Sequence, residues 1–239
     1  MHMIWRSKLL SEFSEISHGF VSYPFSFPFK FGFRYLYNYL RFFFLIKVPS
    51  GNWIFADQVH GDKIYLVKKE VNKIFPKIAY KTDALLSLER KRPLIMFFAD
   101  CMPIYIYVPK IKLVGLVHSG WRGTIRDFPL KVIKHIKESY SIDSKEILIS
   151  VGPSIHSCCF EVKEDFISQL PKEYKKFIIT RNHKTFYDLV ELVNYQFKKE
   201  NIPDSNIEIS HICTFCDKNF YSFRRDRNSN RNLGYIFLK

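Results

Sequence analysis

Two histidines and one cysteine stand at comparable places along the chain: His60, Cys101 and His118. Each lies where a turn signal interrupts an apolar run: a glycine follows His60, a Met-Pro pair follows Cys101 and a Ser-Gly pair follows His118. Neighbouring strands can bring such positions to one rim of a sheet. Two imidazoles and one thiolate suit zinc, and three protein ligands leave the fourth position to water or substrate. Structural zinc usually takes four protein ligands, so a zinc ion held by these three residues would be catalytic.

The spacing alone is compatible with other interpretations. A buried free cysteine and two core histidines bonded to backbone carbonyls would give the same pattern. A second alternative is a nucleophilic pair of Cys101 and His118, as in cysteine hydrolases. Zinc content separates the metal centre from the nucleophilic pair, because a ligated thiolate resists alkylation.

The segments that must position these residues have the patterns of strands and helices. Apolar runs and turn signals predict strands in residues 52–67, 92–109, 110–120, 145–155, 206–215 and at the end of the chain. Periodicity predicts helices from about Thr124 onward and within residues 162–170 and 185–202. Without a repeat or a linker, the chain is expected to form one mixed α/β domain over residues 1–239.

Residues 1–50 have the least regular pattern. Residues 21–33 (VSYPFSFPFKFGF) alternate aromatic side chains with prolines, which indicates an edge strand or irregular structure. Residues 34–47 (RYLYNYLRFFFLIK) are compatible with a short helix or a pair of strands.

Composition and charge narrow the class of protein. The chain is 47% hydrophobic, which is typical of a globular protein, and its net charge of +14 favours anionic partners. The lysines are scattered and no nucleic-acid-binding module is recognised, so a basic nucleic-acid-binding protein is the weaker alternative. The apolar run at 39–48 is too short to span a bilayer. The start does not resemble a signal peptide, and five cysteines in odd number suggest a reducing compartment, so we expect a cytoplasmic location without membrane partners.

Seven motifs occur in a fixed order: QVHG, TDALLS, ADCMPI, GLVHSGWRGT, VGPSIHSCCFEV, CTFC and FYSFRR. In that order they resemble the bacterial polyphenol oxidase or laccase-domain family, also called the peptidoglycan editing factor family, over about residues 53–239. The resemblance implies metal ligation by His60, Cys101 and His118, with zinc expected over copper. It also implies a single domain of layered mixed sheets flanked by helices, an αββα-like sandwich. Residues 18–20 (HGF) match the family's usual opening, but the Arg- and Gly-containing segment that normally follows is missing, so residues 1–50 are divergent.

Members of that family are described as zinc-dependent purine nucleoside phosphorylases with adenosine deaminase activity. The resemblance thus implies phosphorolysis of adenosine, inosine and methylthioadenosine, with nucleosides and phosphate as partners. A loop of glycines and arginine before a helix start suits phosphate, because N–H groups and the helix dipole favour an anion. Five residues are candidates for phosphate or substrate binding: Gly120, Arg122, Gly123, Arg224 and Arg225. Trp121 is expected either to stack on a base or to anchor the turn.

Deamination would need a carboxylate that is not a ligand and that moves protons. Asp83 in TDALLS and Asp100 next to Cys101 are the two candidates. Asp100 would point away from Cys101 in a regular strand, so a role in holding the turn is an equally good expectation for it.

Other functions compete with this interpretation. The older family description as a copper-dependent polyphenol oxidase fits poorly, because the chain has eight histidines and no H-x-H pair. Amide hydrolysis in editing of peptidoglycan precursors stays open, and so does the oligomeric state. Cys213 and Cys216 form one C-x-x-C, a weak metal signal without a second such pair, and Cys158 and Cys159 are expected to pack as small apolar groups.

Overall fold

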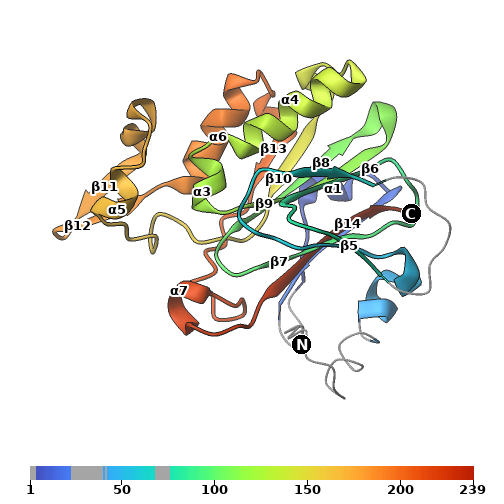
Figure 1. The fold of residues 1–239 in the computed structure, drawn as a ribbon, viewed down its shortest axis with the longest axis horizontal. Coiled ribbons are helices and arrows are strands. Elements are labelled where there is room, and N and C mark those ends of the chain that lie inside the picture. The colour runs from blue at the N-terminus through green and yellow to red at the C-terminus, as the bar shows by residue number, and fades with distance from the viewer. Residues whose placement is uncertain (1–3, 23–39, 41, 68–75) are drawn as a thin grey trace.

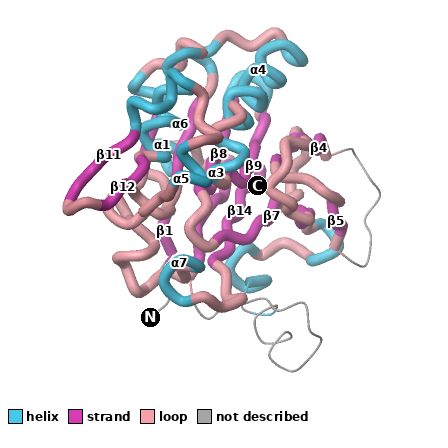
Figure 2. The backbone as a smooth tube through the Cα atoms, turned by 60° about the vertical axis from the view of Figure 1, so that its left-hand side comes forward, coloured by secondary structure: helices cyan, strands magenta, loops and turns pink. Residues whose placement is uncertain are grey.

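A computed structural model of the protein describes residues 4–22, 40, 42–67 and 76–239. Two six-stranded sheets lie face to face, with helices on the outside (Figure 1; Figure 2). Strands run both parallel and antiparallel in each sheet. The expected mixed α/β fold, with layered mixed sheets between helices, is confirmed.

The first sheet has the strand order β1-β2-β14-β7-β3-β5 and the second the order β13-β10-β8-β9-β6-β4. The strands of the first sheet are β1 (Ile4–Trp5), β2 (Ile16–Val21), β3 (Ile54–Ala56), β5 (Lys77–Ala79), β7 (Leu94–Phe98) and β14 (Asn232–Leu238). Those of the second sheet are β4 (Ile64–Leu66), β6 (Ala84–Ser87), β8 (Met102–Val108), β9 (Leu113–Ser119), β10 (Leu148–Val151) and β13 (Ile207–Ile209). A separate pair is formed by β11 (Ile178–Arg181) and β12 (Lys184–Tyr187).

The described α-helices are α1 (Lys8–Ser11), α3 (Trp121–Thr124), α4 (Phe128–Tyr140), α5 (Glu164–Ile167), α6 (Leu189–Lys199) and α7 (Phe223–Asp226). Short 3-10 turns occupy Ser50–Asn52, Pro109–Ile111, Ser144–Glu146, Lys172–Phe177 and Asp204–Asn206. Among the described residues, no helix is long and apolar enough to cross a membrane.

The alternation of side chains along β14 shows why the two sheets stack. Leu233 and Tyr235 belong to an apolar cluster on the outer face of the first sheet, whereas Ile236 belongs to the cluster between the two sheets. Successive side chains of a strand point to opposite faces, so a strand that is apolar throughout must be covered on both sides. Residues 42–46, which are helical, cover the outer face of the first sheet.

Helices α4 and α6 cover the outer face of the second sheet (Figure 1). Val132, Ile133 and Ile136 of α4 and Phe197 of α6 are buried there. Each such side chain contributes about 1.5–3 kcal/mol when it leaves water. The amphipathic periodicity of these segments therefore corresponds to real contact with the sheet.

The prediction of one helix from about Thr124 is wrong at its start. The chain forms the single turn α3 and then α4, and Asp127 between them has a left-handed backbone with φ of 61°. Pro129 explains the break, because its ring would clash with the carbonyl of Ile125 in a continuous helix. Thr124 does not cap α4: its hydroxyl lies 3.0 Å from the Gly120 carbonyl oxygen, to which it donates.

Other predicted segments are shorter than their sequence ranges. Residues 185–202 form the end of β12 and then α6, which Asp188 caps by accepting from the Glu191 N–H at 3.0 Å. Only residues 164–167 of the range 162–170 are α-helical, and only residues 207–209 of the range 206–215 form a strand. Of the two interpretations of residues 34–47, the described part (42–46) is helical; residues 23–39 and 41, which include most of the predicted edge strand, lie outside the described residues.

Candidate metal centre

His60, Cys101 and His118 meet although they come from three different segments. One nitrogen from each imidazole and the Cys101 sulfur all lie within 4.8 Å of one another. The Cys101 Sγ is 3.9 Å from His60 Nε2, and the two imidazole centroids are 4.8 Å apart. Antiparallel pairing of β8 and β9 places His118 beside the turn that carries Cys101. The strand ends singled out in the sequence thus converge on one point.

The QVHG segment is held by side-chain contacts that extend the first sheet beyond β3. Gln58 accepts from the Phe97 N–H at 2.8 Å and donates to the Phe97 carbonyl at 2.9 Å, as a paired strand residue would. His60 has a left-handed backbone with φ of 58°, which is uncommon for a residue with a Cβ. Strain of this kind persists where the surrounding contacts enforce it, and it turns the His60 ring toward Cys101.

Asp83 enforces that conformation from the start of β6. Its buried carboxylate accepts N–H bonds from Val59, His60 and Gly61 at 3.2, 3.1 and 2.7 Å. The same carboxylate accepts from His118 Nδ1 at 2.8 Å. Burial raises the pKa of Asp83, but the bonds from His118 and from the backbone outweigh burial and lower it. Asp83 is therefore an ionised anchor for both histidines.

The Asp83 contact selects the nitrogen that His118 offers to the site. Because Nδ1 faces the carboxylate, Nε2 is left to face Cys101 and His60. Histidine ligands of metals commonly donate their second nitrogen to a carboxylate in this way, which fixes the ring and increases its basicity. The arrangement fits a metal ligand.

Cys101 and His118 stabilise charge on each other in the protein without metal. Burial raises the pKa of the Cys101 thiol, but the His118 charge and hydrogen bonds from His118 and His60 bring it down to about 6. Burial lowers the pKa of His118, whereas the Cys101 thiolate and the Asp83 contact raise it to about 9. Cys101 is thus poised as a thiolate, the form that binds a metal or acts as a nucleophile.

Gly120 lies against two members of the trio. A Cβ at this position would come within 2.9 Å of His60 Cδ2 and 3.2 Å of the Cys101 Sγ. Real Cβ atoms do not approach so closely, so only glycine leaves room for both side chains. Gly123 differs, since it is buried against Phe128 at the start of α4.

A cavity of about 900 Å³ opens beside the trio. His60, Cys101 and His118 all line it. Aromatic side chains form much of the remaining wall, contributed by Phe55, Tyr80, Phe97, Trp121, Phe160 and Phe223. Four arginines line it against two aspartates: Arg122, Arg224, Arg227 and Arg231 against Asp57 and Asp100. The cavity therefore combines apolar rings with positive charge.

Trp121 and Arg122 form one unit of the cavity wall. The Arg122 guanidinium lies 4.2 Å from the centroid of the Trp121 ring, and Trp121 packs edge-on against Phe166 at 5.1 Å. Arg122 is exposed. Trp121 is thus an anchor and a lining residue at once, and Arg122 presents its charge to the cavity.

The two arginines of the FYSFRR motif have different surroundings. Arg224 lines the cavity, and its Nη1 donates to the Glu161 carbonyl at 2.8 Å. The Arg225 side chain instead donates to the carbonyls of Thr214 and Phe215, at 2.8 and 2.9 Å, and pairs with Asp226. Arg225 therefore holds its own loop rather than the cavity wall.

Asp100 lines the cavity with both carboxylate oxygens engaged. Oδ1 accepts from the Thr214 hydroxyl at 2.8 Å and Oδ2 accepts from the Arg224 N–H at 2.7 Å. Its φ of 80° makes it a second strained residue beside the trio. These contacts fix the turn that carries Cys101.

Several residues of this region have no place in the expectations from sequence. Gln58 holds the QVHG segment, and Arg227 and Arg231 add charge to the cavity. The recurrence of arginine at 224, 227 and 231 was an available signal for the last two. Of the two cysteines expected to pack as small apolar groups, Cys159 packs against an apolar cluster whereas Cys158 is exposed. Their sulfur atoms also lie within 4.8 Å of those of Cys213 and Cys216.

Comparison with known proteins shows the family to which the chain belongs. The family described as multi-copper polyphenol oxidoreductase laccase matches residues 36–239. The chain belongs to this laccase family. The match includes all three members of the trio and leaves out most of the divergent residues 1–50, as the sequence motifs indicate.

Curated relatives in the laccase family carry a different description. A purine nucleoside phosphorylase of Borreliella burgdorferi is 33% identical over 182 residues, covering 73% of this chain and 75% of the relative. Purine nucleoside phosphorylase YlmD of Geobacillus stearothermophilus is 32% identical over 199 residues, covering 79% and 73%. Relatives of this laccase-family chain are thus named for nucleoside chemistry.

Solved structures share the fold. The crystal structure of YlmD from Geobacillus stearothermophilus has a TM-score of 0.83 at 27% identity and covers 95% of this chain and 93% of that one. The structure of the hypothetical protein YfiH of Bacillus licheniformis has a TM-score of 0.82 at 28% identity, covering 94% and 93%. The layered sheets are therefore the family's common architecture.

Proposed function

We propose that this protein is a zinc-dependent purine nucleoside phosphorylase acting on adenosine, inosine and methylthioadenosine. The observation that carries the proposal is the trio of metal-type donors at the wall of a cavity with aromatic and cationic sides. Relatives named purine nucleoside phosphorylase support the choice of substrate. Phosphate and nucleoside are then the two partners of the cavity.

His60, Cys101 and His118 would hold the zinc ion. Two imidazoles and a low-pKa thiolate match the donor set of catalytic zinc sites, and the Asp83 contact leaves His118 Nε2 free to ligate. Zinc would supply Lewis acidity toward an oxygen of substrate or water. Gly120 would keep the space for the ligands open, which is its role in place of direct phosphate binding.

Arginines would bind the phosphate. Arg122 is exposed on the cavity wall, and a guanidinium can make a bidentate contact with a phosphate. Arg224 would contribute charge from the opposite loop while its backbone N–H stays on Asp100. In phosphorolysis a phosphate oxygen bonds to the ribose C1′ as the C–N bond breaks, and the bonding electron pair leaves with the purine.

Aromatic rings would hold the base. Tyr80 and Phe223 are unusually exposed for such large side chains, at 68% and 49%, and both line the cavity. Stacking on a base would cover this apolar surface. Trp121, which lies in the cavity wall beside Arg122, would also contact the base.

Adenosine deamination is a second proposed activity at the same centre. Asp100 lines the cavity and is the better placed carboxylate for moving a proton, although its present bonds favour a role in holding Cys101. Asp83 is buried among donors, so we assign it the positioning of the two histidines.

Copper chemistry is the less favoured alternative despite the family's description. A trinuclear oxygen-reducing cluster needs many histidines, and each of the two metal-type groups among the described residues has at most two. Zinc with nucleoside chemistry fits the three-donor set better.

Product analysis tests the proposal. Purified protein would be incubated with adenosine and zinc, with and without phosphate, and the products separated by chromatography. Adenine that forms only with phosphate supports phosphorolysis, whereas inosine indicates deamination. The proposal would be overturned if neither adenine nor inosine formed and the protein instead oxidised a phenol when loaded with copper, or released amino acids from cell-wall precursors.

A further inference from the structure

The second metal-type group lies outside the trio, where two loops leave neighbouring strands. Strands β10 and β13 pair in parallel, so the chain leaves both at the same edge of the sheet. The loop after β10 carries Cys158 and Cys159, and the loop after β13 carries Cys213 and Cys216. A parallel bridge between Ser154 and Cys213 continues the pairing into the loops.

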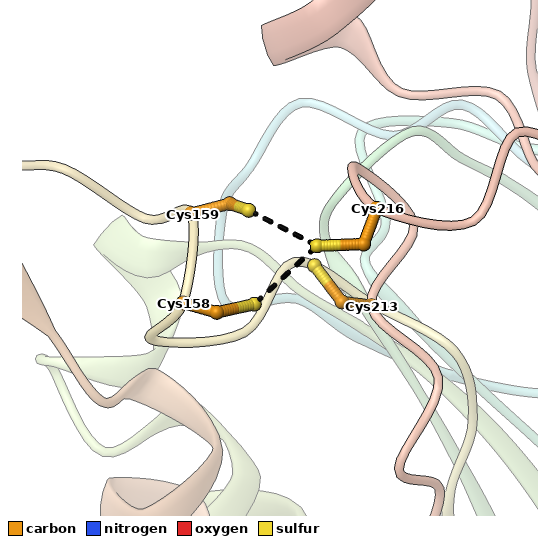
Figure 3. A group of neighbouring side chains, drawn as sticks. All are labelled: Cys158, Cys159, Cys213 and Cys216. Atoms are coloured by element: carbon orange, nitrogen blue, oxygen red, sulfur yellow. Dashed lines mark hydrogen bonds between the residues drawn. The ribbon is translucent and has the colours of Figure 1, made fainter.

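The four sulfur atoms converge on one point (Figure 3). Cys216 Sγ is 3.3 Å from Cys159 Sγ and 3.7 Å from Cys158 Sγ, and all four sulfurs lie within 4.8 Å of one another. A tetrahedral zinc ion with bonds of about 2.3 Å would separate its sulfur ligands by about 3.8 Å. The observed spacing matches a cage for one ion.

A disulfide and an iron–sulfur cluster both fit this spacing less well. A disulfide would bring two sulfurs to about 2 Å and leave the other pair unexplained, whereas here all four cysteines are free. An iron–sulfur cluster needs a wider cage, because several atoms must lie between the thiolates. A single ion such as zinc accounts for all four positions.

One cysteine connects this cage to the interior. Cys213 is the buried member of the four and belongs to the apolar cluster on the outer face of the second sheet. An ion held there is therefore anchored to the core.

We propose that Cys158, Cys159, Cys213 and Cys216 bind one zinc ion as a structural site distinct from the trio. Four protein ligands leave no position for substrate, which is the mark of a structural zinc. The site shares no ligand with the trio, so its metal can be tested separately from the proposed enzymatic function.

The ion would fix one wall of the substrate cavity. The first loop contributes Ile155 and Phe160 to that wall, and the second loop leads into Phe223 and Arg224. Thr214, within the C-x-x-C, donates to Asp100, the neighbour of Cys101. Clamping the two loops by a metal therefore holds the turn that carries a member of the trio.

Metal analysis of purified protein tests the site. Wild-type protein, prepared under reducing conditions with zinc and freed of loose metal, should hold two zinc ions per chain. Cys101→Ala should keep only the zinc ion of the four cysteines. The double variant Cys158→Ser with Cys216→Ser should keep only the zinc ion of the trio. Ser157→Ala, beside Cys158 but without a sulfur change, should hold two. One ion in the wild type and none in Cys101→Ala would overturn the proposal while leaving the proposed function intact.

Two further measurements need no change in the four cysteines. In Cys101→Ala, four thiols should resist alkylation until a chelator removes the zinc. Cobalt loaded into that variant should show the intense sulfur-to-metal charge-transfer absorption of a thiolate site. Four thiols that alkylate equally fast with and without chelator, or a disulfide found in the reduced preparation, would overturn the proposal even if the double variant fails to fold.

Discussion

The trio and the four-cysteine group gather their donor atoms in two different ways. Both gather side chains at the ends of strands, and both bring their donor atoms within 4.8 Å. The trio mixes imidazole with thiolate, opens on a cavity and is oriented by Asp83. The four cysteines are all sulfur and join two loops. The number of donors and the presence of the cavity, rather than the cysteine content, distinguish the proposed catalytic site from the proposed structural site.

The cysteines of the two groups also differ in how easily they ionise before any metal binds. At the trio, His118 and Asp83 prepare the ionised form of Cys101. At the four-cysteine group, burial and hydrogen bonds to neighbouring sulfurs raise the pKa of Cys158 to about 12. A pre-ionised ligand set would take up a metal readily, whereas Cys158 would have to lose its proton as an ion enters.

The largest expected effect comes from removing the trio's sulfur. Cys101→Ala should lower phosphorolysis of adenosine by about 10³-fold or more, the scale seen when a main electrostatic group of an active site is lost. The readout is initial rate together with zinc per chain. Near wild-type activity in a zinc-depleted Cys101→Ala sample would show that the reaction does not depend on the trio.

The thiols of metal-free protein should alkylate at very different rates. With a pKa of about 6, Cys101 is mostly thiolate at pH 7, and its rate should fall as the pH drops through 6. Cys158, with its pKa raised to about 12, should react at least about 10²-fold more slowly than Cys101 at pH 7. Peptide mapping by mass spectrometry after short exposure measures both. Equal rates would mean that the contrast in charge is absent.

A methyl group at Gly120 should disturb the trio. Gly120→Ala places a Cβ 2.9 Å from the His60 ring, so the zinc affinity should fall about 10–100-fold, as it does when supporting contacts are lost. Gly61→Ala is the matched control, because its Cβ would meet Val59 and Asp83 at ordinary distances of 3.4 and 3.6 Å. Competition with a chelator measures both, and equal affinities would refute the steric argument.

The smallest effect should come from one phosphate contact. Arg122→Gln should raise the KM for phosphate about tenfold with little change in kcat, because one charged hydrogen bond contributes about 1.5–3 kcal/mol. Arg126→Gln, an exposed position on the same segment that does not line the cavity, should leave the KM unchanged. A lower kcat at unchanged KM would place Arg122 elsewhere in the reaction.

The sequence marks each member of the trio by a local turn signal at the end of an apolar run. Their interpretation as one ligand set needed the family resemblance as well, because the spacing alone is compatible with core residues. The break between α3 and α4 could have been predicted too, since Pro129 is incompatible with a continuous helix through Ile125. The four-cysteine group could not, because Cys159 and Cys213 meet only through the parallel pairing of β10 and β13. A pattern along one strand does not tell which strand lies beside it.

The arginines of the cavity wall also differ in how well the sequence predicts their roles. The sequence motifs single out Arg122, Arg224 and Arg225, but only Arg122 and Arg224 line the cavity. Nothing local distinguishes Arg225 from Arg224, yet Arg225 is committed to the carbonyls of its own loop. Only the three-dimensional path of the loop separates the two roles.

The pairing of β2 with β14 has a consequence for biosynthesis. Ile16 lies opposite Leu238, so β2 must wait for a strand that is made more than 200 residues later. β14 also pairs with β7, the strand that runs into Cys101. On the ribosome this sheet stays open until residue 238 has left the exit tunnel, and its bare edges need protection from other nascent chains until then. Since β7 leads into Cys101, the sheet beside the trio is completed only after β14 has been synthesised, which makes its closure a late step of folding.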